Sequence, residues 1–393
     1  MNRNLWLLVL AQGFFLTNNV TFIAINGLVG WSLAPLPWMA TLPVMGYVVG
    51  GAMSTGLVAR TQMRWGRKIS FQLGLLIAIL SCLLCAWAVA QKSFWLLLAG
   101  TVIAGYYQAN GQLYRFAASE LARPDWKEKA VSLVLAGGIF GAVLGPNMAN
   151  HTRELLSVPY AGAYLSLALV ALAGMAAIGF MQFPPAPARK AGEGGRPLAE
   201  IVRQPVFIVS AAAASLGYGV MNLLMSATPI AMQQCGHAFS STAFVLEWHV
   251  IGMFAPGFFT GHLIRRLGVM PVLWAGVALN LACIALALSG IDLMHFTASL
   301  FLLGVGWNFL FTAGTALALQ SYRPEEKDKA QAAINFCVFA VMALSSFSAG
   351  ALVTTRGWPL LNMGSLLPLA LVAGLLLWYR GRQLSPGSLT SPG

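Results

Sequence analysis

One polar segment occurs twice in this sequence, as Arg123-Pro-Asp-Trp-Lys-Glu-Lys-Ala130 and, about two hundred residues later, as Arg323-Pro-Glu-Glu-Lys-Asp-Lys-Ala330. Long apolar runs stand on both sides of each copy. A second pair of segments, Arg64-Trp-Gly-Arg-Lys68 and Gly261-His-Leu-Ile-Arg-Arg-Leu-Gly268, recurs with nearly the same offset. Two matched segments at one offset indicate that the chain is built from two related halves.

The apolar runs predict helices that cross a membrane. The chain is 58% hydrophobic and 9% charged, whereas about a quarter of the residues are charged in an ordinary soluble domain. A helix needs about twenty apolar residues to cross the hydrocarbon layer. This length divides the chain into twelve predicted spans, at residues 4–30, 36–59, 69–90, 94–116, 130–150, 160–183, 206–230, 240–263, 270–290, 296–319, 331–353 and 357–380.

The basic residues predict how these spans are oriented. With the N-terminus in the cytoplasm, all 23 Lys and Arg except Lys92, Arg153 and Arg356 fall in cytoplasmic loops or at cytoplasmic helix ends. Membrane proteins retain Lys and Arg on the cytoplasmic side. We therefore expect an all-α membrane protein with two pseudo-symmetric six-helix bundles and both termini in the cytoplasm. Its parts are the bundles 1–183 and 206–382, a cytoplasmic linker at 184–205 and a flexible tail at 383–393.

The same pattern argues against several classes of function. The net charge is +12, but the basic residues lie in short gaps between apolar runs and are not collected on a soluble face. A lipid bilayer is therefore the expected partner, and nucleic acid is not. The sequence shows no nucleophile–base pair and no phosphate-binding loop, so we expect neither an enzyme nor a tightly held cofactor.

Two motifs resemble those of a known family. Arg64-x-Gly-Arg-Lys68 resembles the end of the loop signature of the major facilitator superfamily, and Gly141-x-x-x-Gly-Pro146 resembles its fifth-helix motif. The acidic residue usual in the loop signature is Met63 here and Arg265 in the second copy, so the charge latch of that family does not transfer to this chain. The resemblance implies a transporter that works by alternating access, with its two bundles rocking against each other.

Potential metal ligands are concentrated in two consecutive predicted spans. Met221 and Met225 are one helical turn apart in the span 206–230, and His249 and Met253 are one turn apart in the next, so each pair shares a helix face. Thioethers and imidazole are soft ligands, which favour Cu(I) over Mg, Ca or Mn. Methionine pairs in apolar helices also serve packing, so spacing alone leaves the two interpretations even.

The four residues together carry a closer resemblance. Met221-x-x-x-Met225 and His249-x-x-x-Met253 resemble the paired signature of the CcoA-like copper importers, a bacterial branch of the superfamily. This implies import of copper as Cu(I) across the bacterial inner membrane for assembly of haem–copper oxidases. Copper is then the transported substrate, held by the second half, and a copper donor outside and a chaperone inside are implied partners. The flanking residues also resemble riboflavin-transporting relatives, so the alternative is an organic-solute permease of riboflavin or efflux type.

Three polar residues near these spans are further candidates. Cys235 and His237 lie in the loop between the two spans, where they are either a metal relay or incidental loop residues. Glu247 is the one carboxylate placed within a predicted span. It is expected either to carry a coupling proton or to be hydrated near the membrane surface.

The first half contains a polar stripe. Asn18 and Asn19 lie in the first span and Gln108 and Asn110 in the fourth. These side chains are expected to line a central cavity, in which the many Trp and Tyr would add aromatic surface. Hydrogen bonds between helices explain them equally well. Arg115 is expected to extend to the inner membrane surface.

Overall fold

The computed structural model describes residues 3–123, 130, 133–134, 136–183, 195–323 and 326–384. All regular secondary structure in these residues is helical. The first repeated polar segment, most of the predicted linker and the predicted tail (124–129, 184–194 and 385–393) lie outside the described residues. The proposed division into two bundles, a linker and a tail therefore remains a prediction at these boundaries.

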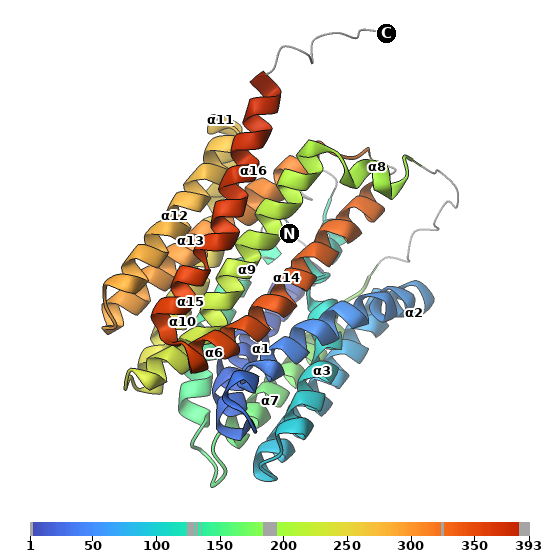
Figure 1. The fold of residues 1–393 in the computed structure, drawn as a ribbon. Coiled ribbons are helices and arrows are strands. Elements are labelled where there is room, and N and C mark those ends of the chain that lie inside the picture. The colour runs from blue at the N-terminus through green and yellow to red at the C-terminus, as the bar shows by residue number, and fades with distance from the viewer. Residues whose placement is uncertain are drawn as a thin grey trace.

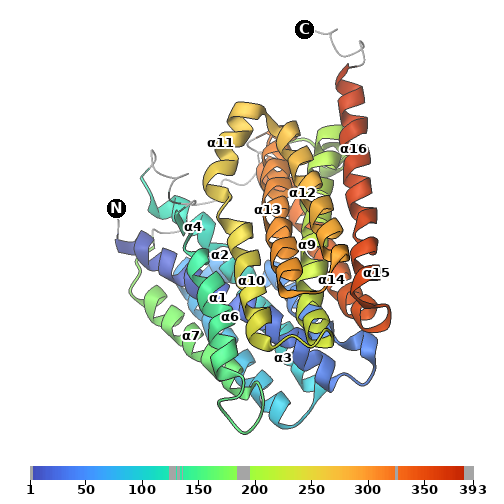
Figure 2. The ribbon, with the colours of Figure 1, turned by 90° about the vertical axis from the view of Figure 1, so that its left-hand side faces the viewer.

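The first half contains six α-helices and one short 3₁₀ helix in its described residues. They are α1 (Arg3–Leu33), η1 (Pro37–Met39), α2 (Leu42–Ala90), α3 (Phe94–Gly111), α4 (Tyr114–Leu121), α6 (Gly138–Thr152) and α7 (Ala161–Gly179). The helices α1 to α7 gather on one side of the molecule, as Figures 1 and 2 show.

The second half begins with a short helix and continues with long ones. They are α8 (Leu198–Val202), α9 (Pro205–Gln234), α10 (Phe239–Phe254), α11 (Gly257–Leu267), α12 (Val269–Ser289), α13 (Leu293–Ala318), α14 (Lys327–Thr355), α15 (Gly357–Gly364) and α16 (Leu366–Leu384). They occupy the other side of the molecule (Figure 1). Within this half α13 packs against α9, α10 and α12.

Nine helices of the described chain are long and apolar enough to cross a membrane. The difference from the predicted twelve has local causes. The predicted spans 36–59 and 69–90 form one helical run, which Gly66 interrupts with a non-helical backbone. Helix α3 is only 18 residues long and carries Gln108 and Asn110, and α6 is 15 residues long. The count of twelve and the cytoplasmic location of the termini stay predictions.

Two glycines mark the same turn in the two halves. Gly66 has φ 77° and ψ 171°, and Gly268, about two hundred residues later, has φ 89° and ψ 167°. L-residues rarely adopt a positive φ, so glycine suits both positions. The two turns lie in the segments that the sequence pairs as a repeat, and their matching backbone geometry supports the internal repeat.

The glycines of the fifth-helix motif allow close packing of α6 on α1. A Cβ atom at Gly141 would lie 2.5 Å from the backbone nitrogen of Thr17. A Cβ atom at Gly145 would lie 2.9 Å from the Thr21 hydroxyl. Small residues let membrane helices approach at backbone distance. The motif therefore has a structural role in this chain.

The two halves are joined by hydrogen bonds at one end of the molecule. We call this the Trp38 end, because η1 and the start of α2 lie there. The Thr41 hydroxyl donates to the Ser346 carbonyl oxygen and accepts from the Gly350 amide, and the Trp38 ring meets Phe347 edge to face at 5.8 Å.

The opposite end carries α8 and the turn at Gly66, and we call it the linker end. There the described ion pairs lie within one half or join α8 to the second half, as in Arg67–Glu120 and Arg196–Glu326. The structure thus represents a state closed at the Trp38 end. With the orientation that the basic residues predict, the closed end faces outward.

Candidate functional site

The four predicted copper ligands are all buried. Met221 and Met225 lie on α9 with 2% and 4% exposure, and His249 and Met253 lie on α10 with 0% and 6%. Both helices pack against α13. Gly304 lets α13 approach α10 closely, because a Cβ atom at this position would lie only 2.4 Å from the His249 carbonyl oxygen. The predicted pairs therefore lie in the protein interior, on two helices that share a neighbour.

The hydrogen bond of His249 determines which ring nitrogen is free. Its Nδ1 lies 2.7 Å from the Leu300 carbonyl oxygen. A carbonyl oxygen only accepts, so Nδ1 carries the proton and, in the neutral ring, Nε2 has a lone pair. Within the described residues this buried Nε2 has no hydrogen-bond partner. Imidazoles that ligate metals are often oriented in this way, by a backbone carbonyl on the other nitrogen.

The other potential ligands do not form a conventional cluster. The described part of the chain contains no group of three or more His, Cys, Asp or Glu that could hold a metal ion. A metal bound here would therefore depend on the three thioethers. The predicted ligand set remains a prediction.

Cys235 and His237 are turned towards separate neighbours. The Cys235 thiol is half-buried at the end of α9, and burial raises its pKa, which disfavours the metal-binding thiolate. The Nε2 of His237 lies 2.8 Å from the Ile291 carbonyl oxygen, and its ring packs edge to face on Phe296 at 5.7 Å. These contacts give His237 a local structural role, and the metal relay remains a prediction.

Glu247 joins the two halves. Its Oε2 accepts a hydrogen bond of 3.0 Å from the side-chain nitrogen of Asn147 on α6. The carboxylate is half-buried. Glu247 is therefore part of the closure at the Trp38 end, and its predicted role in proton coupling is not tested by this contact.

The polar stripe of the first half divides into two kinds of residue. The Asn19 amide donates to the Tyr47 hydroxyl at 3.2 Å, and the Asn110 oxygen accepts from the Ser70 hydroxyl at 2.9 Å. These two residues join helices within the first half. In the described structure, by contrast, both amide atoms of Asn18 and the Oε1 of Gln108 are buried without a hydrogen-bond partner.

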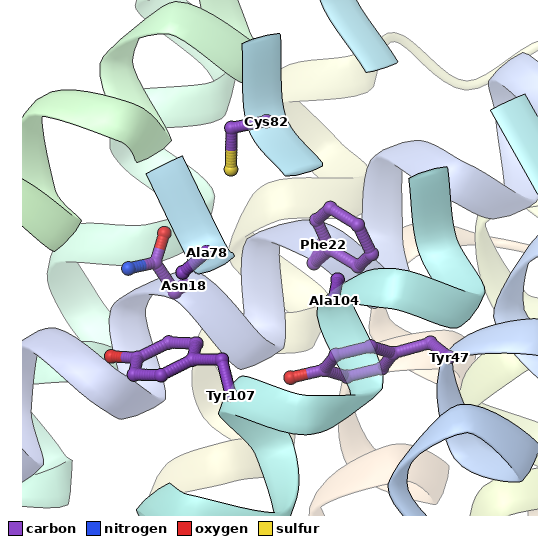
Figure 3. A pocket seen from close by; sticks show the side chains of 7 residues that line it. All are labelled: Asn18, Phe22, Tyr47, Ala78, Cys82, Ala104 and Tyr107. Carbon is purple, nitrogen blue, oxygen red and sulfur yellow. The ribbon is translucent and has the colours of Figure 1, made fainter. Parts of the chain in front are cut away.

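Figure 3 shows Asn18 in its surroundings. Its amide lies beside the Tyr107 hydroxyl and interacts with it, but among the described residues neither group reaches good hydrogen-bonding geometry with any partner. The cavity lined by Asn18, Tyr47, Cys82 and Tyr107 encloses about 10 Å³, which holds at most one water. This cavity is too small for a transported solute.

An aromatic cluster of the second half lies at the boundary with the first half. Trp307 and Phe311 of α13 stack at 5.3 Å with an interplanar angle of 13°, and Tyr218 of α9 and Phe254 of α10 meet Trp307 edge to face. Tyr218 and Phe311 pack on a cluster that includes Val48 of α2. Phe254 packs on the cluster of the first half. We call these four rings the aromatic face.

Two polar residues of the first half, Arg115 and Tyr47, lie near Tyr218 of the aromatic face. Arg115 of α4 and Tyr218 are close enough to interact electrostatically, and so are Tyr47 of α2 and both Tyr107 and Tyr218. The Nε of Arg115 and the indole nitrogen of Trp307 are buried without a partner in the part of the chain that the structure describes. We call Asn18, Tyr107, Gln108 and Arg115 the polar face. Of these four, Arg115 has a described interaction with the second half, whereas Asn18 and Tyr107 line the small cavity within the first half.

Sequence reasoning named only part of these two faces. It placed Arg115 at the membrane surface, whereas its Nε is buried beside the second half. It also named none of the four rings individually. The spacing of Trp307 and Phe311, one helical turn apart, was a usable signal for a shared helix face. Which face turns to the other half depends on tertiary packing.

Membrane-length helices in two related halves that are joined at one end are typical of a membrane transport protein. The chain belongs to the major facilitator superfamily, whose family model, Major Facilitator Superfamily, matches residues 5–346 and 221–392. The protein is a non-enzymatic, multi-pass membrane permease with the all-helical fold of that superfamily.

Several known proteins are similar over nearly the whole chain. The riboflavin transporter RfnT of Brucella anthropi is 37% identical over 92% of this chain and 91% of its own. The uncharacterized transporter YdeG of Bacillus subtilis is 28% identical over 97% of this chain and 92% of its own. The crystal structure of the D-xylose–proton symporter has a TM-score of 0.75 at 14% identity and covers 95% of this chain and 96% of its own, which shows the fold alone.

These relatives change the interpretation of the Met and His motifs. The superfamily predicted from the sequence is confirmed. The assignment to the copper-importing branch is not supported, because the relative at 37% identity is named for riboflavin and not for copper. The comparisons therefore favour the organic-solute alternative over copper import.

Proposed function

We propose that the protein is an organic-solute permease of the riboflavin type, located in a bacterial inner membrane. The observation that carries the proposal is the aromatic face at the boundary of the two halves, with Arg115 of the first half beside it. The similarity to a riboflavin transporter supports it. Alternating access of the two halves would expose the solute to one side of the membrane at a time.

The aromatic face suits a flat heteroaromatic ring. The Trp307–Phe311 stack offers parallel ring surfaces, and Tyr218 and Phe254 border it edge to face. Stacking of a heteroaromatic base on an aromatic side chain contributes about 1–3 kcal/mol. A planar ring system of two or three fused rings would make contact with several of these side chains at once.

The polar face suits the hydrogen-bonding edge of such a solute. Arg115 supplies a donor, Tyr107 a hydroxyl, and Asn18 and Gln108 amide oxygens, all with atoms unpartnered in the described structure. Leaving buried polar groups unpaired costs about 1–3 kcal/mol each. A solute that forms hydrogen bonds with these groups therefore binds more tightly than an analogue that lacks the matching groups. The analogue would leave the protein groups unpaired.

Copper import is the second candidate, and one observation favours it. His249 is held through Nδ1 by the Leu300 carbonyl, while Nε2 is buried without a partner in the described chain. With Met221, Met225 and Met253 this nitrogen would offer Cu(I) a soft ligand set. Copper would then be the transported substrate, and a donor outside and a chaperone inside would remain proposed partners.

One uptake experiment separates the two candidates. The purified full-length protein is reconstituted into liposomes, and uptake of radiolabelled riboflavin and of radioactive copper is measured side by side. We expect saturable riboflavin uptake that exceeds that of protein-free liposomes. His249→Gln and Met253→Leu, which approximately preserve volume, should leave riboflavin uptake within about twofold.

The outcome that contradicts the proposal is equally definite. Riboflavin uptake no higher than in protein-free liposomes, together with copper uptake that both variants abolish, would show a copper importer. Size-exclusion profiles of the two variants verify that each is folded.

A further inference from the structure

A large groove lies in the second half, away from the two faces described above. It runs between α9 and α14 beneath α8 and has a volume of about 810 Å³. Its walls are mostly apolar and include Phe207 and Ile208 of α9 and Ala333 and Phe336 of α14. The volume falls within the range of about 300–1,000 Å³ that is usual for ligand sites.

The groove faces the membrane and not the first half. Phe336 is 74% exposed, whereas Val338 is buried against a cluster that includes Val48 of α2. Two residues along an α-helix lie about 200° apart around its axis. Because Val338 faces the first half, Phe336 points to the opposite side. An apolar ring exposed there is in contact with lipid.

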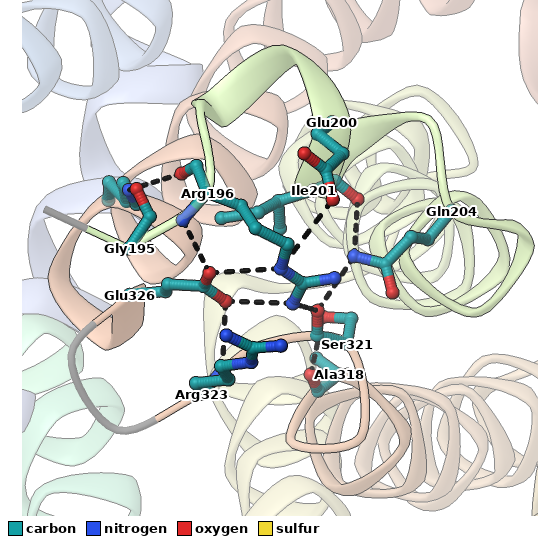
Figure 4. Close-up of polar contacts among 10 residues, drawn as sticks. Gly195, Arg196, Glu200, Ile201, Gln204, Ala318, Ser321, Arg323 and Glu326 are labelled. Carbon is teal, nitrogen blue, oxygen red and sulfur yellow. Dashed lines mark hydrogen bonds and ion pairs between the residues drawn. The ribbon is translucent and has the colours of Figure 1, made fainter. Parts of the chain in front are cut away.

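Helix α8 is fixed over one end of the groove by a buried ion pair. Arg196 donates from Nε to Glu326 Oε1 at 2.9 Å and from Nη2 to Glu326 Oε2 at 2.8 Å, and its backbone amide donates to the same carboxylate at 2.7 Å. The Arg323 amide adds a bond of 3.0 Å. Figure 4 shows these donors converging on Glu326.

The charges in this cluster leave a basic rim at the groove. The Glu326 side chain is fully buried, and its hydrogen bonds with Arg196 hold the pKa of the carboxyl well below its usual range, so it stays charged and neutralises Arg196. Lys329 lines the groove, and its ammonium donates to the backbone carbonyls of Gly195 and Arg196. Arg203 is exposed in the turn between α8 and α9, next to the groove residue Val202.

We propose that this groove binds an anionic phospholipid. One acyl chain lies in the groove along Phe207, Ala333 and Phe336, and the headgroup phosphate lies at the rim against Lys329 and Arg203. Lys329 comes just before the predicted span 331–353, which is the depth of the headgroups. Basic pockets between membrane helices on the cytoplasmic side favour anionic headgroups in this way.

The sequence of the first half contains no counterpart of the Arg196–Glu326 ion pair. In the repeated polar segment Trp126 occupies the position that corresponds to Glu326, while Lys129 corresponds to Lys329. The carboxylate that fixes Arg196 thus has no sequence counterpart in the first half. The proposal accordingly assigns one such site to the molecule, on the second half.

Native mass spectrometry of the purified full-length protein tests the proposal with two probes, phosphatidylglycerol and phosphatidylethanolamine. We expect phosphatidylglycerol to bind more tightly. Each of Lys329→Gln and Arg203→Gln should weaken it about fivefold, the effect of one interfacial charge. Ala333→Trp, which fills the groove, should weaken both lipids. The matched control is Arg265→Gln with Arg266→Gln on α11, which should leave binding unchanged.

Two results would overturn the proposal. Equal binding of the two lipids would show that the site does not recognise the charge of the headgroup. An equal loss in the Arg265→Gln, Arg266→Gln control would show that total charge, and not this groove, attracts the anionic lipid. Because Arg203 is exposed and has no described side-chain contact to lose, its variant remains informative even if Lys329→Gln disturbs α8.

Discussion

The two halves of the chain present different chemistry to each other. The first half contributes the polar face, in which Arg115, Tyr107 and Asn18 have buried polar atoms without described partners. The second half contributes the aromatic face around Trp307. The two related halves thus differ in the side chains that they carry. Under the proposed function, Arg115 would meet the edge of the solute and the aromatic face its ring surface.

This comparison changes what the sequence alone suggested. The soft ligands on α9 and α10 placed the substrate on the second half, with the first half as a moving wall. The structure instead gives each half part of a candidate site. A solute held from both sides also couples binding to movement, because its contacts are complete only when the two faces approach each other.

The largest effect is expected from breaking the aromatic face. Trp307→Ala removes the ring that contacts Tyr218, Phe254 and Phe311. Loss of one stacking partner costs about 1–3 kcal/mol, so KM for riboflavin uptake should rise about 5- to 150-fold. Trp307→Phe should recover most of the loss. The measurement is initial uptake into proteoliposomes over a riboflavin concentration series.

The matched control for Trp307 is Trp248→Ala. Trp248 is 41% exposed on α10 and packs beside Phe244 and Phe301. Its loss removes an indole of equal size from the second half, outside the aromatic face. A KM change as large as that of Trp307→Ala would mean that the aromatic face has no special role.

Much of the fold follows from the sequence, because lipid leaves the backbone few choices. A chain in hydrocarbon must satisfy its own hydrogen bonds, so each apolar run of sufficient length becomes a helix. The predicted spans 206–230 and 296–319 correspond to α9 (Pro205–Gln234) and α13 (Leu293–Ala318). Within the helical run Leu42–Ala90, the backbone is non-helical at Gly66, in the basic segment that separates the predicted spans 36–59 and 69–90.

The candidate site was harder to predict, for a physical reason. The rotation of each helix about its axis is set by neighbours that are distant in sequence. Whether Trp307 turns towards α9 and α10 or towards lipid cannot be derived from its own segment. Asn110 illustrates the converse case, because its polar side chain is used by Ser70 and Tyr106 within the first half.

A smaller effect is expected from the charged group of the polar face. Arg115→Gln removes the guanidinium, whose Nε is buried without a partner in the described residues. A hydrogen bond to a charged group contributes about 1.5–3 kcal/mol, so the KM for riboflavin should rise at least about tenfold. The control is Arg64→Gln, an exposed Arg at the linker end that lies over the Trp65 ring. Equal KM values for Arg115→Gln and the native protein would show that Arg115 does not contact the solute.

The smallest effect, and the sharpest test of the polar face, is expected from Tyr107→Phe. This change removes one hydroxyl and keeps the edge-to-face packing of the ring on Phe15 at 5.4 Å. Because the hydroxyl makes no hydrogen bond of good geometry and only adjoins the Asn18 amide, its loss should lower thermal stability little. A neutral hydrogen bond to the solute contributes about 1 kcal/mol, so KM should rise about fivefold.

Tyr164→Phe is the matched control for Tyr107→Phe. Its hydroxyl donates to the Asn26 side-chain oxygen at 2.8 Å, and the residue is fully buried. Removing that donor leaves the Asn26 oxygen unpaired, so the unfolding temperature should fall while the riboflavin KM stays the same. The two variants thus lose the same atom with opposite consequences. If Tyr107→Phe instead lowers stability and leaves KM unchanged, the hydroxyl stabilises the first half and does not contact the solute.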